Sequence, residues 1–323
     1  MNKRILILIL MLFAVVASAE NAANQQVATF SIVAADPEAG EVGIAVASRF
    51  FAVGSVVPWA DAGVGAVATQ AYANTSFGWR GLDMLDMGLT PAEVLTVLVR
   101  NDDSSARRQF GIVDSAGNAV TFTGDSCSAW AGGRAGKNYA VQGNILTGEE
   151  VVIEMEKAFL DSKGTLAERM YAALTAGEKA GGDSRGKQSA ALLIAKDKAG
   201  YGGFTDRAID IRVDDSEEPF KELGRLLGIA EMNYSWNEAW TLFTEGKFQE
   251  ALPHMERTAK LAPEYPEVLY DLAVIRASAG DTEGALQALE KSLELNPKLK
   301  AQAKADNDLA GLRGNEKFEK LVK

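Results

Sequence analysis

Apolar runs and turn residues near the start of the chain follow the pattern of a β-hairpin. Residues 29–35 are small, apolar or β-branched, and Pro37 and Gly40 mark a turn directly after them. A second apolar run, residues 42–48, then leads back. The pattern predicts two antiparallel strands, of which the first begins at Thr29.

Further strands and helices follow in blocks. Short runs rich in Val, Ala, Ile and Gly predict more strands at residues 64–69, 110–114, 118–123, 191–196 and 207–213. Two longer stretches predict helices, at residues 77–100 with an interruption at Gly88 and at residues 149–174 with an interruption near Gly164. Hairpins combined with helix blocks favour an α+β fold of layered antiparallel sheets flanked by helices over a doubly wound parallel sheet.

The C-terminal part of the chain repeats with a period of 34 residues. Four pairs of like residues have this separation: Gly246 and Gly280, Ala251 and Ala285, Leu261 and Leu295, and Pro263 and Pro297. The period, and the small alanine between paired helices, are typical of tetratricopeptide repeats. The expected helices are residues 234–244, 248–261, 266–279 and 282–295, with a last helical segment at 298–322.

An acidic break at residues 214–218, followed by Pro219, predicts the boundary between the two parts. A short helix over residues 220–229 is expected to close the first part. We therefore predict an α+β domain over residues 29–229 and an all-α repeat domain over residues 230–323.

The first 19 residues predict a cleaved signal peptide, because two basic residues precede a short apolar core and an Ala-Ser-Ala cleavage site. The mature chain is then expected to begin at Glu20, with a polar leader over residues 20–28, and to be periplasmic or secreted. An uncleaved anchor is the alternative, although the apolar run is short for a membrane span. No membrane span is expected after cleavage.

Charge and residue counts exclude several classes of function. Removing the signal peptide takes away Lys3 and Arg4 and changes the formal net charge from −11 to −13, which argues against nucleic acid and anionic membranes as partners. Cys127 is the only cysteine, so an intrachain disulfide is impossible. His254 is the only histidine and lies far from the first domain in sequence. A Ser-His-Asp triad is therefore excluded within that domain unless His254 reaches back to it. A histidine-built metal site is excluded, and no metal or cofactor is expected.

Thr29 is the first candidate for chemistry. A threonine at a processed N-terminus supplies both a nucleophile, its hydroxyl, and a base, its own α-amine. The alternative is a β-branched residue that simply opens a strand.

Other candidate residues follow the ends of predicted strands or lie in a glycine-rich polar loop. The strand-end residues are Arg49, Gln70, Asn74 and Asn144, whose amide and guanidinium groups are suited to binding a carbonyl or carboxylate. The loop spans residues 181–191 and contains Asp183, Arg185, Gln188 and Ser189. The alternative for the loop is a solvated, flexible connection.

Three segments of the first domain, residues 29–70, 139–146 and 181–193, resemble the domain-of-unknown-function-1028 family, whose fold is related to the N-terminal nucleophile hydrolases. The resemblance implies a four-layer αββα sandwich. It also implies that Thr29 matches a threonine that methionine removal exposes in some family members. Here a second cut, after Ala28, is required to expose it.

Two functions remain open. The first is an exported amide-bond hydrolase that acts on a small or peptide-like substrate, with Thr29 as the nucleophile. In this hypothesis Arg49 and Arg185 bind a substrate carboxylate, and Asn144 or Gln70 lies near the oxyanion. The second is a non-catalytic ligand-binding or scaffold protein, whose repeats bind a protein or peptide partner in a groove near Tyr234, Trp240 and Tyr270. A homodimer is also possible, because a sandwich with broad apolar strands can associate with a second copy.

Overall fold

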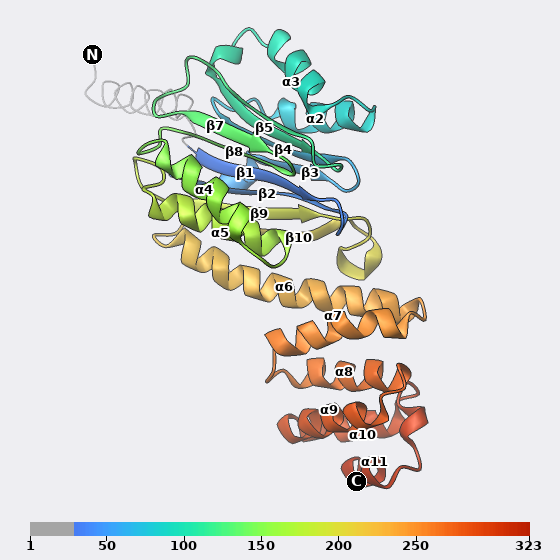
Figure 1. The fold of residues 1–323 in the computed structure, drawn as a ribbon. Helices are drawn as coiled ribbons and strands as arrows, with labels where there is room; N and C mark the ends of the chain where they lie inside the picture. Colours follow the sequence, from blue (N-terminus) through green and yellow to red (C-terminus); the bar gives the residue numbers. More distant parts are fainter. Residues whose placement is uncertain (1–28) are drawn as a thin grey trace, which may run out of the picture.

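The computed structural model describes residues 29–323 of the chain. The predicted signal peptide, residues 1–19, and leader, residues 20–28, lie outside the described residues. Two antiparallel sheets lie between two layers of helices, and a stack of further helices continues from this sandwich to the C-terminus (Figure 1). The predicted fold class, an αββα sandwich followed by an all-α repeat region, is confirmed.

The larger sheet has six strands in the order β10-β9-β2-β1-β8-β7, and the smaller sheet has four in the order β3-β4-β5-β6. The larger sheet comprises β1 (Thr29–Asp36), β2 (Glu41–Ser48), β7 (Gly132–Gly136), β8 (Tyr139–Asn144), β9 (Ser189–Ala195) and β10 (Arg207–Val213). The smaller sheet comprises β3 (Pro58–Asp61), β4 (Gly65–Ala71), β5 (Arg108–Asp114) and β6 (Ala119–Thr123). Three of these strands, β3, β7 and β8, were not among the predicted ones.

Helices cover the outer face of each sheet (Figure 1). The smaller sheet is covered by α2 (Ser76–Asp86) and α3 (Pro91–Arg100), and the larger sheet by α4 (Glu150–Asp161) and α5 (Leu166–Lys179). Thr90 and Thr165 cap α3 and α5, and each forms a capping box with a glutamate three residues later. The predicted interruptions of the two helical stretches are confirmed.

The central strand β1 is buried on both faces. Because side chains alternate between the two sides of a strand, neighbouring residues of β1 enter different cores. Phe30 and Ile32 pack on the helix side with residues such as Met155, and Val33 packs between the sheets with residues such as Ala66. The hairpin that the sequence predicts therefore forms the middle of the sandwich.

The sandwich and the repeats share one long helix, α6 (Pro219–Thr244). The prediction of a short helix over residues 220–229 followed by a separate one from 234 is wrong, because residues 230–233 contain no helix breaker and the helix continues through them. The predicted boundary at 229/230 thus falls inside α6. No helix among residues 29–323 combines the length and apolar character needed to cross a membrane.

The repeat region stacks helices in antiparallel pairs. They are α7 (Phe248–Leu261), α8 (Pro266–Ser278), α9 (Thr282–Leu295), α10 (Lys300–Ala305) and α11 (Glu316–Leu321). Gly246 and Gly280 adopt φ values of 75° and 88° at the turns after α6 and α8, a conformation that glycine adopts without steric cost. Gly314, at φ 85°, continues the same 34-residue spacing.

Candidate functional site

Polar side chains replace the apolar core between the two sheets at the end where β1 begins. On β1, Val33 and Ala35 pack into the apolar part of this space, whereas Thr29 and Ser31 continue the same face with hydroxyl groups. Neighbouring and opposite strands add five more uncharged polar side chains, all of them buried. We call the seven the amide cluster: Thr29, Ser31, Ser48, Gln70, Gln109, Gln142 and Asn144.

Gln109 on β5 lies at the centre of the amide cluster. Its Nε2 atom donates to the carbonyl oxygen of Gly143 at 2.7 Å. Its Oε1 atom accepts hydrogen bonds from Gln70 Nε2 at 2.8 Å and from Asn144 Nδ2 at 2.9 Å. The side chain thus joins both sheets, and its loss would leave several buried polar groups unsatisfied.

Thr29 lies at the outer end of the amide cluster. Its Oγ1 atom donates to Ser48 Oγ at 3.3 Å, and its carbonyl oxygen accepts from Gln70 Nε2 at 3.2 Å. Ser31, two residues on, donates to Gln70 Oε1 and accepts from Gln142 Nε2, each at 2.6 Å. Thr29 is 0% exposed. In the uncut chain its nitrogen is an amide, which has no basicity, so the hydroxyl has no base of its own.

Two strands that supply amides to the cluster end in a left-handed backbone conformation. Ile145, directly after Asn144, has φ 53°, and Ala71, directly after Gln70, has φ 64°. A β-branched residue with positive φ is a rare and strained conformation. The backbone therefore bends sharply where Gln70 and Asn144 are presented.

The glycine-rich loop lies beside this end of the larger sheet. Asp183 accepts hydrogen bonds from the backbone N–H of Arg49 at 2.9 Å and from the guanidinium of Arg185 at 2.9 Å. Arg49 in turn donates to Gln188 Oε1 at 3.0 Å. Ser189 donates to the carbonyl oxygen of Phe50 and accepts from the N–H of Val53. The loop is held to β2 and is not a free, solvated connection.

The structure brings most of the predicted site residues together and leaves one apart. Thr29, Gln70 and Asn144 belong to the amide cluster, and the loop residues lie around Arg49 at its edge. Asn74 instead accepts from the N–H and hydroxyl of Ser76 at the start of α2 and donates to Asp102 Oδ2 at 3.2 Å. Four members of the cluster were not predicted as site residues: Ser31, Ser48, Gln109 and Gln142. Ser31 and Ser48 lie on predicted strands, whereas Gln109 directly precedes a predicted strand and Gln142 lies on a strand that was not predicted.

A second candidate site lies where the sandwich meets the repeats. A cavity of about 720 Å³ is bounded by the loop between β9 and β10 and by helices α6 and α8. We call it the junction groove; its lining includes Tyr201, Phe204, Trp236, Asn237, Trp240 and Asp271. Tyr201 and Phe204 are each 90% exposed, which is unusual for large aromatic side chains.

Hydrogen bonds fix the loop of the junction groove to α6. Asn237 Nδ2 donates to the carbonyl oxygen of Gly200 at 2.8 Å, and its Oδ1 atom accepts from the N–H of Gly202 at 3.0 Å. Of the aromatic residues that the sequence suggested for a groove, Trp240 contributes to the lining. Tyr234 touches the groove but is buried, and Tyr270 is buried with its hydroxyl donating to Asp306 Oδ2 at 2.7 Å.

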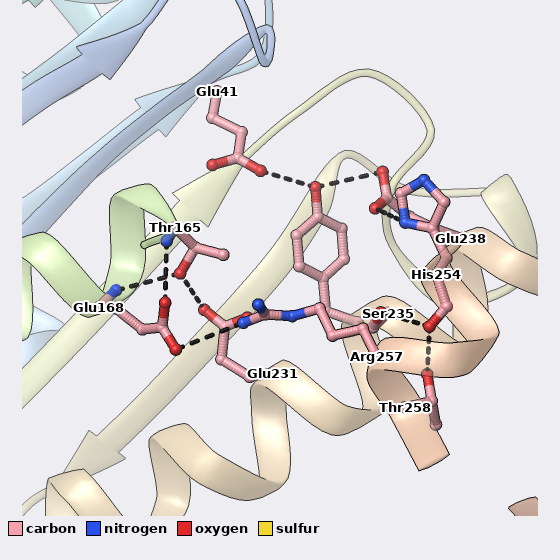
Figure 2. A network of polar contacts seen from close by, with 10 residues as sticks. Glu41, Thr165, Glu168, Glu231, Ser235, Glu238, His254, Arg257 and Thr258 are labelled. Atoms are coloured by element: carbon pink, nitrogen blue, oxygen red, sulfur yellow. Dashed lines mark hydrogen bonds and ion pairs between the residues drawn. The ribbon is translucent and has the colours of Figure 1, made fainter. Parts of the chain in front are cut away.

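A network of polar contacts holds the repeats against the sandwich (Figure 2). Arg257 of α7 bridges Glu231 of α6, at 2.9 Å, and Glu168 of α5, at 3.3 Å. Thr165, the cap of α5, donates to Glu231. These contacts join three helices from both parts of the molecule, α5, α6 and α7.

The same interface buries carboxylates whose pKa values shift in opposite directions. Burial raises the pKa of Glu41, although Tyr234 donates to its Oε1 atom at 2.8 Å. Burial also acts to raise the pKa of Glu238, but hydrogen bonds and charges from His254 and Lys196 outweigh it and lower the pKa to about 2. His254 Nδ1 lies 3.0 Å from Glu238 Oε2. The single histidine thus serves the interface and lies outside the amide cluster.

Comparison with known proteins agrees with this architecture. The crystal structure of protein SPO2555 from Silicibacter pomeroyi has 32% sequence identity and a TM-score of 0.58, and the match covers 63% of this chain and 86% of that one. No curated protein matches the chain. Residues 242–306 match a tetratricopeptide repeat model, and residues 29–223 match the model of the family of unknown function DUF1028. The chain therefore belongs to the DUF1028 family and carries tetratricopeptide repeats, which are protein-interaction modules, after the family domain.

Proposed function

We propose that this protein binds an extended segment of a partner protein in the junction groove. The observation that carries the proposal is the aromatic lining: Tyr201 and Phe204 from the loop after β9 line the same cavity as Trp236 and Trp240 of the shared helix α6, and Asp271 of α8 completes it. A few residues supply most of the binding energy at protein interfaces, and Trp and Tyr are enriched among them. A cavity of this size accommodates several residues of an extended chain. The site requires both parts of the molecule.

In-cell photo-crosslinking tests this function. With p-benzoylphenylalanine in place of Phe204, irradiation is expected to yield a discrete protein adduct that mass spectrometry identifies. The same reagent in place of Leu160, an exposed residue on α4, serves as the control and is expected to give no such adduct. Equal adducts at both positions, or none at either, would contradict the proposal.

A second candidate function is amide-bond hydrolysis by Thr29 after a cut that follows Ala28. The observation that favours it is the position of Thr29, at the end of the space between the sheets beside Ser48 and the amides of Gln70 and Asn144. A free α-amine there would act as the base, Asn144 or Gln70 would donate to the oxyanion, and Arg49 and Arg185 would bind a substrate carboxylate. The same hypothesis takes a small amide or a peptide as the substrate. It assigns further substrate contacts to Asp183, Gln188 and Ser189.

We further propose that the protein is periplasmic or secreted, on the basis of the predicted signal peptide over residues 1–19. The mass of the mature chain tests this together with the hydrolase mechanism. A mature chain that starts at Thr29 supports hydrolysis. A functional chain that starts stably at Glu20 supports export and the binding function, and contradicts hydrolysis by Thr29. A chain that still begins at residue 1 contradicts cleavage of the signal peptide.

A further inference from the structure

The junction groove contains a carboxylate in an unusual environment. Asp271 on α8 accepts the indole N–H groups of both Trp236 and Trp240, each at 2.8 Å. Both indoles donate to the same atom, Oδ2. The carboxylate is thus oriented by two aromatic side chains that also line the cavity.

Within residues 29–323, Asp271 forms no ion pair with a lysine, arginine or histidine. The charges that act on it most are those of Asp306 and Glu267, which are both acidic. Burial, the largest influence, raises the pKa of Asp271, and the two indole hydrogen bonds act against it. Arg207, the cation on the rim of the groove, pairs with Asp210. This carboxylate is therefore costly to keep ionised in the free protein, and a cation in the groove would offset that cost.

We infer that the segment bound in the junction groove is basic, and that a lysine or arginine side chain of the partner lies between Trp236 and Trp240 and pairs with Asp271. This inference rests on the proposed function and adds the chemistry of the partner. Indole faces attract cations, and the attraction strengthens where water is excluded. The net charge of −11 of the whole chain further favours a basic partner over an acidic one.

The inference is tested with the full mature chain and four fluorescein-labelled Gly-Ser peptides of about ten residues, each of which carries one central Lys, Arg, norleucine or Glu. Norleucine keeps the aliphatic stem of lysine and removes the charge. The Lys and Arg peptides are expected to bind about tenfold more tightly than the norleucine peptide in fluorescence anisotropy, and the Glu peptide more weakly than all others.

Asp271→Asn is the matched variant, since an amide oxygen can still accept both indole N–H groups. Circular dichroism checks that the variant is folded. The substitution is expected to remove most of the preference for Lys over norleucine. Asp125→Asn, at an exposed carboxylate on the sandwich, is the control and is expected to keep the preference.

Equal affinity for the Lys and norleucine peptides would overturn the inference while leaving the proposed function intact, since a neutral segment would then occupy the groove. A Lys preference that survives Asp271→Asn would overturn it as well. Binding of a neutral oligosaccharide such as chitotetraose, without binding of any peptide, would overturn both the inference and the proposed function.

Discussion

The amide cluster and the junction groove are both polar sites in largely apolar surroundings, but they differ in what their polar atoms bind. In the cluster, the side chains bind one another across two sheets, and Thr29 is fully covered. In the groove, aromatic faces are exposed and Asp271 lacks a cationic partner among the described residues. Within the cluster, Gln142 Oε1 is buried without a hydrogen-bond partner among the described residues, while the other side chains bind one another. A network that is mostly satisfied from within stabilises a fold, whereas exposed aromatic faces around an unpaired carboxylate indicate a ligand. The comparison therefore favours the groove as the site of binding in the uncut chain.

The largest expected effect is in the amide cluster. Gln109→Leu removes an amide that joins Gln70, Asn144 and Gly143. Because buried polar groups then lose their partners, the free energy of unfolding should fall by about 4 kcal/mol. Urea unfolding measures this. Gln287→Leu, at an exposed glutamine, is the control, with an expected change within about 0.5 kcal/mol. A similarly small change for Gln109→Leu would show that the cluster is not a stabilising network.

A smaller effect is expected at the interface that shapes the groove. Tyr234→Phe removes the hydroxyl that donates to the buried carboxylate of Glu41, which should cost about 2 kcal/mol. Thermal unfolding followed by circular dichroism measures this loss. Tyr265→Phe, at an exposed tyrosine, should change little. Equal stability of both variants would mean that the interface does not depend on this contact.

Loss of the asparagine that holds the groove loop should act locally. Asn237→Ala removes the hydrogen bonds to Gly200 and Gly202. Residues 199–203 should therefore exchange their amide hydrogens faster, because the free energy of opening the loop falls by about 1 kcal/mol. Hydrogen exchange with mass spectrometry measures this, and β1 in the same sample serves as the internal control. Unchanged exchange in the loop would show that other contacts fix the groove.

The smallest effect concerns pH. The folded state raises the pKa of Glu41 through burial, so this group stabilises the fold below its ordinary pKa of 4.5 and loses that contribution as the pH rises through the folded value. Glu41→Gln, which still accepts from Tyr234, should therefore gain stability relative to the natural chain as the pH rises from 4.5 to about 7.5. Urea titrations at several pH values measure the difference. A difference that does not change with pH would contradict the shift.

The sequence predicts the centre of the sandwich and the repeats well, because both follow strong periodic patterns. The hairpin at Thr29 and the 34-residue spacing of Gly246 and Gly280 are local signals that need no tertiary information. Strand β8 was missed because its last residues, Gln142 to Asn144, are typical of turns, and only the opposite sheet makes their burial favourable.

The candidate sites could be predicted only in part. Asn74 was grouped with the other strand-end residues, but its position depends on the start of α2, which spacing does not reveal. The groove was expected near Trp240, yet Tyr201 and Phe204 are distant in sequence and join it only because α6 continues from the sandwich into the repeats. Continuity across residues 230–233 has no sequence signal beyond the absence of helix breakers.

Binding in the junction groove is tested most directly by the affinity of the crosslinked partner segment for three variants of the full chain. We expect Tyr201→Ser combined with Phe204→Ser to weaken binding at least about tenfold. Phe51→Ser, at another exposed aromatic, and Thr29→Ala are expected to leave binding unchanged. Loss of binding in Thr29→Ala, with full binding in the groove variant, would contradict binding in the junction groove and place the function in the sandwich.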